Sequence, residues 1–163
     1  MRATTAIVKD DSFVERAVTR LIEAGLAEPA SICGCREEEI RRLEEGLGVA
    51  LPASYGQFLA RMGRSAGAFL TGTDFLFADL GGLRLQAEEL LHETKADFCL
   101  KDTDFVFVVH QGYQFLFFDT KDSDDPAVWH YEEGDAAPRK VFSHFSEWLD
   151  ACVSDEIDAH SDL

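Results

Sequence analysis

The sequence predicts an α+β protein in which a single antiparallel-rich sheet is flanked by N-terminal helices and a C-terminal helix. Apolar residues recur at helical spacing in the first third of the chain and again near its end, whereas aromatic and β-branched runs are grouped between them. The 163 residues have the usual length of one domain, and a hydrophobic fraction of 46% is enough for a folded core. We therefore expect residues 1–163 to form a single domain.

Three helices are expected before the first strong strand. Ser12 followed by Glu15 has the pattern of a capping box, and apolar residues continue at helical spacing as far as Gly25. Residues 36–48, REEEIRRLEEGLG, place apolar residues on one side of a helix and charges on the other. Residues 52–63, PASYGQFLARMG, begin with a proline suited to a first helical turn and end at a glycine.

The following segment is less regular. Residues 64–82 are rich in Gly, Thr and Ala with short apolar pieces, which predicts one or two short strands or turns. Residues 83–94, LRLQAEELLHET, return to helical spacing and predict a fourth, shorter helix.

A charge-free aromatic segment, FVFVVHQGYQFLFF at residues 105–118, predicts a β-hairpin around Gly112. A three-residue loop, residues 110–112, would pair Val109 with Tyr113, Phe107 with Phe115 and Phe105 with Phe117. Both alternating faces of the first run are apolar, as is typical of a central strand that is covered on two sides. We therefore interpret the segment as core.

The last third is expected to add one strand and one helix. DTKDSDDP, residues 119–126, is a polar loop that should be exposed, and AVWHYEE, residues 127–133, predicts a third strand of the same sheet. After the polar residues 132–140, the segment VFSHFSEWLDACVSDEI, residues 141–157, places apolar residues on one face of a closing helix, with Ser143 as its expected cap.

No pattern in the sequence predicts a catalytic residue, a metal or a cofactor. Four cysteines, at positions 33, 35, 99 and 152, are too few for a disulfide scaffold, and we expect reduced thiols. No second pair of Cys or His completes a zinc site, the aspartates of residues 119–125 lack the spacing of a calcium loop, and no phosphate-binding glycine loop is present. His110 and His130 can meet if their strands are neighbours, so a small enzyme or ligand-binding domain stays open as an alternative.

The charge of the chain favours a basic protein partner. The formal net charge is -16, which repels nucleic acid and anionic membrane surfaces, although acidity for solubility alone is the alternative explanation. Residues 119–162 contain 13 acidic and 3 basic side chains and hold 10 of the 16 net charges. The N-terminal residues MRATTAIVKDDSF lack the apolar run of a signal peptide, and no stretch is long and apolar enough to span a membrane, so a cytoplasmic location is expected.

Several segments carry motif residues in a fixed order. In residues 37–63 these are Ile40, Leu43, Glu44, Gly48, Leu51, Pro52, Tyr55, Phe58, Leu59 and Gly63. FVFVVHQGYQFLFFDT contributes Gly112 and Asp119, and PAVWHY and VFSHFSEWL follow. Together these features resemble the SMI1/KNR4 (SUKH) superfamily, with its aromatic hairpin, later strand and final helix. The resemblance covers residues 31–153 and leaves residues 1–30 as a helical N-terminal extension.

The resemblance implies an α+β fold with no shared catalytic site. Bacterial members of the superfamily are regarded chiefly as immunity proteins that bind and neutralise a toxin domain, often a nuclease, whereas fungal relatives act as scaffolds. Because nucleases are often basic, charge and resemblance together favour a non-enzymatic protein that masks a toxin surface. The expected carboxylate contacts to Arg and Lys of the partner are Asp119, Asp122, Asp124, Asp125, Glu132, Glu133 and Asp135. The expected aromatic anchors, where exposed, are Tyr113, Trp129 and Tyr131.

Overall fold

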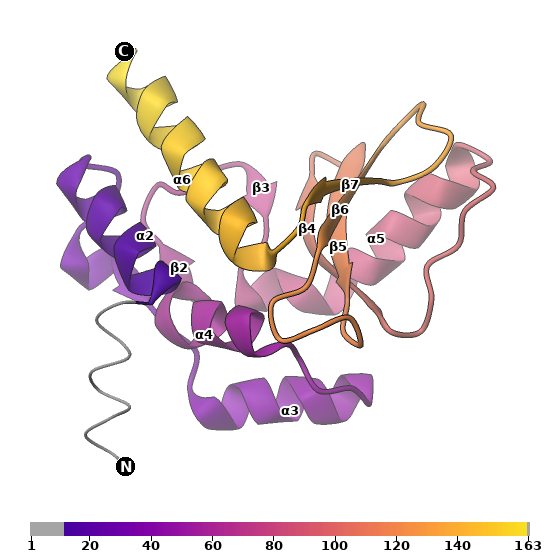
Figure 1. Ribbon diagram of the computed structural model, residues 1–163, viewed down its shortest axis with the longest axis horizontal. Helices are drawn as coiled ribbons and strands as arrows, with labels where there is room; N and C mark the ends of the chain where they lie inside the picture. Colours follow the sequence, from indigo (N-terminus) through magenta and orange to yellow (C-terminus); the bar gives the residue numbers. More distant parts are fainter. Residues whose placement is uncertain (1–11, 163) are drawn as a thin grey trace.

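The computed structural model describes residues 12–162, and Figure 1 shows their arrangement. The helices are α2 (Phe13–Glu23), α3 (Glu37–Leu47), α4 (Ala53–Met62), α5 (Leu80–Glu93) and α6 (Phe145–Ser161), with short 3-10 helices η1 (Pro29–Ser31) and η2 (Phe77–Asp79). The main sheet is antiparallel, and its strands lie in chain order: β3 (Thr73–Asp74), β4 (Asp104–His110), β5 (Gln114–Asp119), β6 (Val128–Glu132) and β7 (Arg139–Phe142). A separate antiparallel pair joins β1 (Ile32–Cys33) to β2 (Ser65–Ala66). The α+β fold class predicted from the sequence is confirmed.

Helix α2 begins as the sequence predicts, but with half of the expected cap. Ser12 Oγ accepts a hydrogen bond from the backbone N–H of Glu15 at 3.0 Å. The Glu15 side chain does not return to the cap and instead accepts a bond from Arg61 Nε of α4 at 2.7 Å. The first eleven residues of the expected N-terminal extension, and with them most of the segment tested for a signal peptide, lie outside the described residues.

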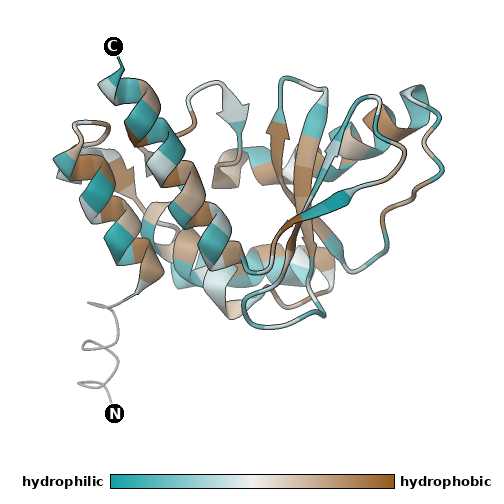
Figure 2. Cartoon of the chain, turned by 45° about the horizontal axis from the view of Figure 1, so that its top comes forward, coloured by the Kyte–Doolittle hydropathy of each residue, from teal (hydrophilic) through white to brown (hydrophobic). Residues whose placement is uncertain are grey.

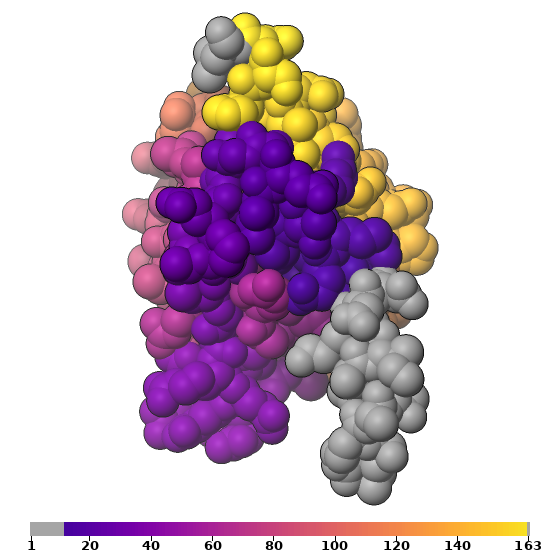
Figure 3. Space-filling view, turned by 90° about the vertical axis from the view of Figure 1, so that its left-hand side faces the viewer, coloured from indigo at the N-terminus to yellow at the C-terminus, as the bar shows by residue number. Residues whose placement is uncertain are grey.

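Helix α2 packs directly against α6, and Figure 3 shows the two helices side by side although they stand at opposite ends of the sequence. Arg20 of α2 donates hydrogen bonds to Asp150 Oδ1 at 2.9 Å and to Ser154 Oγ at 2.8 Å. The buried residues of α2 belong to the same hydrophobic cluster as the sheet: Val14, Ala17, Val18 and Leu21. This helix is therefore part of the core.

The aromatic hairpin forms, but its predicted pairing is wrong. The observed pairs are His110–Gln114, Val109–Phe115, Val108–Leu116, Val106–Phe117, Phe105–Phe118 and Asp104–Asp119. Gln111 and Gly112 both have positive φ, as a type I′ turn requires, and Tyr113 N donates to His110 O at 3.2 Å. The register between β4 and β5 shifts by one residue between Val106 and Val108, so Phe107 has no direct partner on β5.

The sheet is covered on both faces, as the apolar pattern of β4 predicts. On one face, Tyr55 of α4 has ring contacts with centroid separations of 5.2 to 6.0 Å to Phe105, Phe107, Phe118 and Phe145. On the other face, Thr94 at the end of α5 is hydrogen-bonded to Tyr131 of β6, with 2.8 Å between their oxygens. Figure 1 shows the sheet between these helices, and Figure 2 shows hydrophobic colouring concentrated on its central strands.

Several boundaries differ from the predicted ones. Helix α5 begins at Leu80, three residues before the predicted start, and β7 lies in a segment that was predicted to be loop and the start of the closing helix. Ser143 does not cap α6, because the N-cap position is occupied by His144. Among the described residues, no helix combines the length and hydrophobicity that a membrane span needs.

Candidate functional site

The predicted contact carboxylates lie at two ends of β6. Four of them lie in residues 119–127, which begin with the last residue of β5 and are called here the 119–127 loop. The other three lie in residues 132–138, which begin with the last residue of β6 and are called here the 132–138 turn. The five residues of β6 separate the two groups by roughly 15 Å at the rise of an extended strand. Figure 1 shows the 119–127 loop beside α4 and the 132–138 turn at the opposite end of the sheet. The structure therefore divides the predicted acidic surface into two.

The 119–127 loop is fixed by its own carboxylates. Asp125 accepts bonds from Ser146 N at 2.9 Å and from Ser146 Oγ at 2.6 Å, which satisfies the first turn of α6. Asp122 Oδ2 accepts from Ala127 N at 2.9 Å, and the backbone oxygen of Asp124 accepts from Ser54 N at 2.9 Å. Asp125 is thus half-buried in a structural role, whereas the side chains of Asp122 and Asp124 are exposed.

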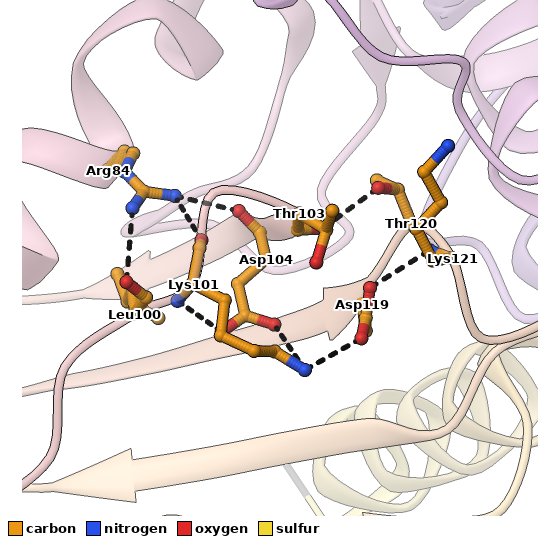
Figure 4. Close-up of polar contacts among 8 residues, drawn as sticks. All are labelled: Arg84, Leu100, Lys101, Thr103, Asp104, Asp119, Thr120 and Lys121. Atoms are coloured by element: carbon orange, nitrogen blue, oxygen red, sulfur yellow. Dashed lines mark hydrogen bonds and ion pairs between the residues drawn. The ribbon is translucent and has the colours of Figure 1, made fainter.

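Asp119 belongs to a polar cluster that bridges β4 and β5 (Figure 4). Lys101 Nζ lies 2.7 Å from Asp119 Oδ2 and 3.9 Å from Asp104 Oδ1. Partial burial acts to raise the pKa of Asp119, but hydrogen bonds from Lys101 and from the Lys121 backbone outweigh it and lower the pKa. Burial raises the pKa of Asp104, only partly offset by the Lys101 N–H and ammonium. Asp119 is therefore already paired with a cation of its own chain.

The lysine of this cluster is positioned by Arg84 of α5. Arg84 Nη1 donates to the backbone oxygens of Lys101 at 3.1 Å and of Asp104 at 2.9 Å. Asp104 Oδ2 accepts from Lys101 N at 2.8 Å. Sequence reasoning missed all three residues, because Lys101 and Asp104 come just before the aromatic hairpin, whereas Arg84 lies in α5 and meets them only in the folded structure.

An open pocket of about 520 Å³ lies beside the cluster on the α5 face of the sheet. Its apolar lining comes from Phe98, Phe117, Ala127, Trp129, Ala137 and Pro138, and its charged lining from Lys101, Asp104, Asp119, Asp122 and Lys140. We call this cavity the Trp129 pocket. It contains three of the predicted contact residues, Asp119, Asp122 and Trp129, and it lies between the two acidic groups.

The three predicted aromatic anchors differ in exposure. Trp129 is half-buried, and Tyr113 is half-buried with its ring 5.8 Å from that of His110 in an edge-on contact. Tyr131 has no exposed surface, because its ring packs on Phe115 and its hydroxyl is bonded to Thr94. The aromatic anchors were expected to be exposed, and Tyr131 is not, so it is not a candidate contact. Side chains alternate between the two faces of β6, and the side chain of Tyr131 lies on the face that α5 covers.

The two histidines of the alternative prediction lie near one another but are separated by β5. Both line a pocket of about 310 Å³ between the sheet and α6. His110 Nδ1 is 2.8 Å from Thr73 Oγ1, and His130 Nε2 is 2.7 Å from Gln114 Oε1. Burial lowers the pKa of His130, with nearby Arg139 acting in the same direction. Each ring is thus held by a neutral side chain, the hydroxyl of Thr73 beside His110 and the amide of Gln114 beside His130. The thiol of Cys152 lines the same pocket.

The thiols and carboxylates assemble no metal centre within residues 12–162. The four cysteines are free. Burial is the main cause that raises the pKa of Cys152 to about 12 and also raises that of Cys35, so neither is a reactive thiolate at neutral pH.

Comparison with known proteins places this fold in a family. A search of the curated proteins found no match. The SMI1 / KNR4 family (SUKH-1) matches residues 34–151, which span α3 through the first seven residues of α6 and leave α2 outside. The match covers more than half of the chain and agrees with the helix–hairpin–helix order described above. The chain belongs to the SMI1 / KNR4 family (SUKH-1).

Proposed function

We propose that this protein is a non-enzymatic binding module, an immunity protein that neutralises a basic toxin domain by covering its active surface. Proteins of the family commonly act in immunity, and the surface of this chain has the charge that a basic partner requires. The site of action that this role implies is the cytoplasm.

The observation that carries the proposal is the set of exposed carboxylates without a cation of their own. Eight exposed acidic residues in 119–162 form no ion pair with any described residue: Asp122, Asp124, Glu132, Glu133, Glu147, Asp155, Asp158 and Asp162. Like charges at this density repel one another and weaken the folded state. A basic partner would relieve that repulsion, and the same field would accelerate its association.

The first experiment uses the full chain as bait for proteins of its own host at low salt, followed by elution with a salt gradient. A basic toxin or nuclease domain that elutes as salt rises, and whose activity the protein inhibits, is the expected result. A housekeeping protein in its place would indicate the scaffold function of the fungal relatives. A column that captures nothing while the host expresses its toxins contradicts the proposal.

Charge reversal then tests the location of the surface. Asp122→Lys with Asp124→Lys should slow association with the captured partner and flatten its salt dependence. The matched control is Glu23→Lys with Glu45→Lys, two exposed acidic residues on α2 and α3. Both pairs change the net charge equally, so an equal effect from both would show that only the total charge matters.

A further inference from the structure

The Trp129 pocket combines an aromatic lining with a carboxylate that lacks a cation. Phe117 and Trp129 are register partners on neighbouring strands, so their side chains stand next to each other on the same face. Phe98 closes the pocket with its ring centroid 5.8 Å from that of Phe117. Such a lining favours a flat or long apolar group over a small polar one.

The charged groups of the lining are not equivalent. Lys101 is engaged by Asp119 at 2.7 Å and by Asp104 at 3.9 Å, so these two carboxylates already share a cation of the chain itself. Asp122 is exposed and forms no ion pair with the described residues; one of its oxygens accepts from Ala127 N, and the other has no bond within the described chain. Asp122 is therefore the group of the lining best placed to accept a cation.

Lys140 is the opposing charge. It is the register partner of Trp129 on the edge strand β7, is exposed, and forms no ion pair with the described residues. An ammonium at this rim would attract an anionic group, so the pocket offers two opposite preferences at its two sides. The surroundings of the pocket favour a cation over an anion. Asp124 adds a second exposed carboxylate near Asp122 in the sequence, and the C-terminal quarter as a whole is strongly acidic.

We propose that the Trp129 pocket receives an arginine side chain of the basic partner, with the guanidinium stacked on Trp129 and paired with Asp122. This proposal rests on the proposed function for the positive charge of the partner, whereas the preference for arginine comes from Trp129 and Asp122 in the lining of the pocket. Arginine fits this lining better than lysine, since its planar guanidinium stacks on aromatic rings and binds a carboxylate through two parallel bonds. Its aliphatic stem covers the remaining apolar wall.

The test uses two capped tripeptides, acetyl-Gly-Arg-Gly-amide and acetyl-Gly-Glu-Gly-amide, titrated at millimolar concentration into the isotope-labelled full chain. The chain has two tryptophans, and Trp148 is 3% exposed, so its indole N–H signal is an internal control for that of Trp129. The expected result is a saturable shift of the Trp129 signal with the arginine peptide only. No shift, or an equal or larger response to the glutamate peptide, overturns the proposal.

Matched variants locate the interaction. Asp122→Asn preserves an acceptor for Ala127 N but removes the charge, and it should weaken binding of the arginine peptide by roughly tenfold, the loss of one charge-assisted pair. Asp158→Asn on α6 removes the same charge at an exposed position far along the chain and should leave binding unchanged. Equal weakening by both variants contradicts a specific role for Asp122.

The outcomes separate this proposal from the proposed function. A Trp129 response to the arginine peptide supports the pocket even if no basic toxin is captured from the host. Conversely, a captured basic toxin that binds Asp122→Asn and Trp129→Ala as tightly as the unchanged protein supports the function and overturns the pocket as its contact.

Discussion

Asp125 and Ser146 are joined by two hydrogen bonds, of 2.9 and 2.6 Å, across 21 residues of the chain. The carboxylate replaces the missing side-chain cap of α6, whose N-cap residue is His144. A negative charge at this end of a helix also interacts favourably with the helix dipole. One residue of the acidic loop therefore has a structural role, whereas the exposed side chains of Asp122 and Asp124 remain accessible to a partner.

Removal of this cap should destabilise the protein without affecting a partner directly. Asp125→Ala is expected to lower the free energy of unfolding by about 1–2 kcal/mol, measured by urea denaturation. The control is Asp124→Ala, whose side chain is exposed, with an expected change within about 0.5 kcal/mol. Equal stabilities of the two variants would show that Asp125 is not a cap.

Gly34 is required where its loop approaches α4. A Cβ at this position would collide with the backbone of Ala60 and Arg61. Gly34→Ala should therefore cost about 3 kcal/mol or prevent accumulation of folded protein. Gly46→Ala is the opposite case, since a Cβ in α3 meets nothing within 4 Å and should stabilise the helix by about 0.5–1 kcal/mol. Thermal unfolding of both variants checks the signs.

Helix α2 lies outside the family match but is expected to unfold together with the rest of the chain. Leu21 is 0% exposed, and Leu21→Ala should cost about 2–5 kcal/mol. Ile22→Ala, at the half-buried neighbour, should cost clearly less. The measurement is urea unfolding followed in parallel by circular dichroism and by tryptophan fluorescence, to which both Trp129 and Trp148 contribute. Two separate transitions, with helix signal lost first, would show that α2 is an independent unit.

His130 and His144 should change the stability of the protein in opposite directions as pH falls. Burial is the main cause that lowers the pKa of His130, and Arg139 acts in the same direction against Glu132 and Asp135. The folded state therefore favours the neutral ring. The stability that His130 contributes is lost as pH falls below the unfolded pKa of about 6.5 and through the lowered folded pKa. A bond to the Asp125 backbone is the main cause that raises the pKa of exposed His144, with Asp122, Asp125 and Glu147 adding to it. His144 therefore contributes stability below its unfolded pKa and loses it as pH rises through the folded value.

Two variants distinguish these contributions between pH 7 and pH 5. His130→Gln should reduce the loss of unfolding free energy on acidification, and His144→Gln should increase that loss. Chemical denaturation at each pH measures both. Identical pH profiles for the two variants and the unchanged protein would contradict the assigned directions.

Part of the candidate site could be predicted from the sequence. The sequence predicts that the loop of residues 119–126 is exposed, which holds for Asp122 and Asp124, whereas Asp119 and Asp125 are half-buried. Glu132 and Glu133 are exposed as well. The sequence did not indicate that Asp125 caps a helix or that Lys101 pairs with Asp119, because each contact joins segments that meet only after the sheet forms. Tyr131 and Trp129 are two residues apart on β6, so strand alternation alone could not show that only Trp129 remains partly exposed.

The sequence by itself determined the fold class, the order of the helices and the existence of the aromatic hairpin, because these depend on local periodicity and on residue preferences along the chain. Tertiary structure decided the hairpin register, where the turn at Gln111 and Gly112 and the irregularity near Phe107 shift the pairing. It also decided the strand β7 and the Trp129 pocket. Both depend on which segments pack together, since Lys140 becomes the neighbour of Trp129 only when β7 pairs with β6.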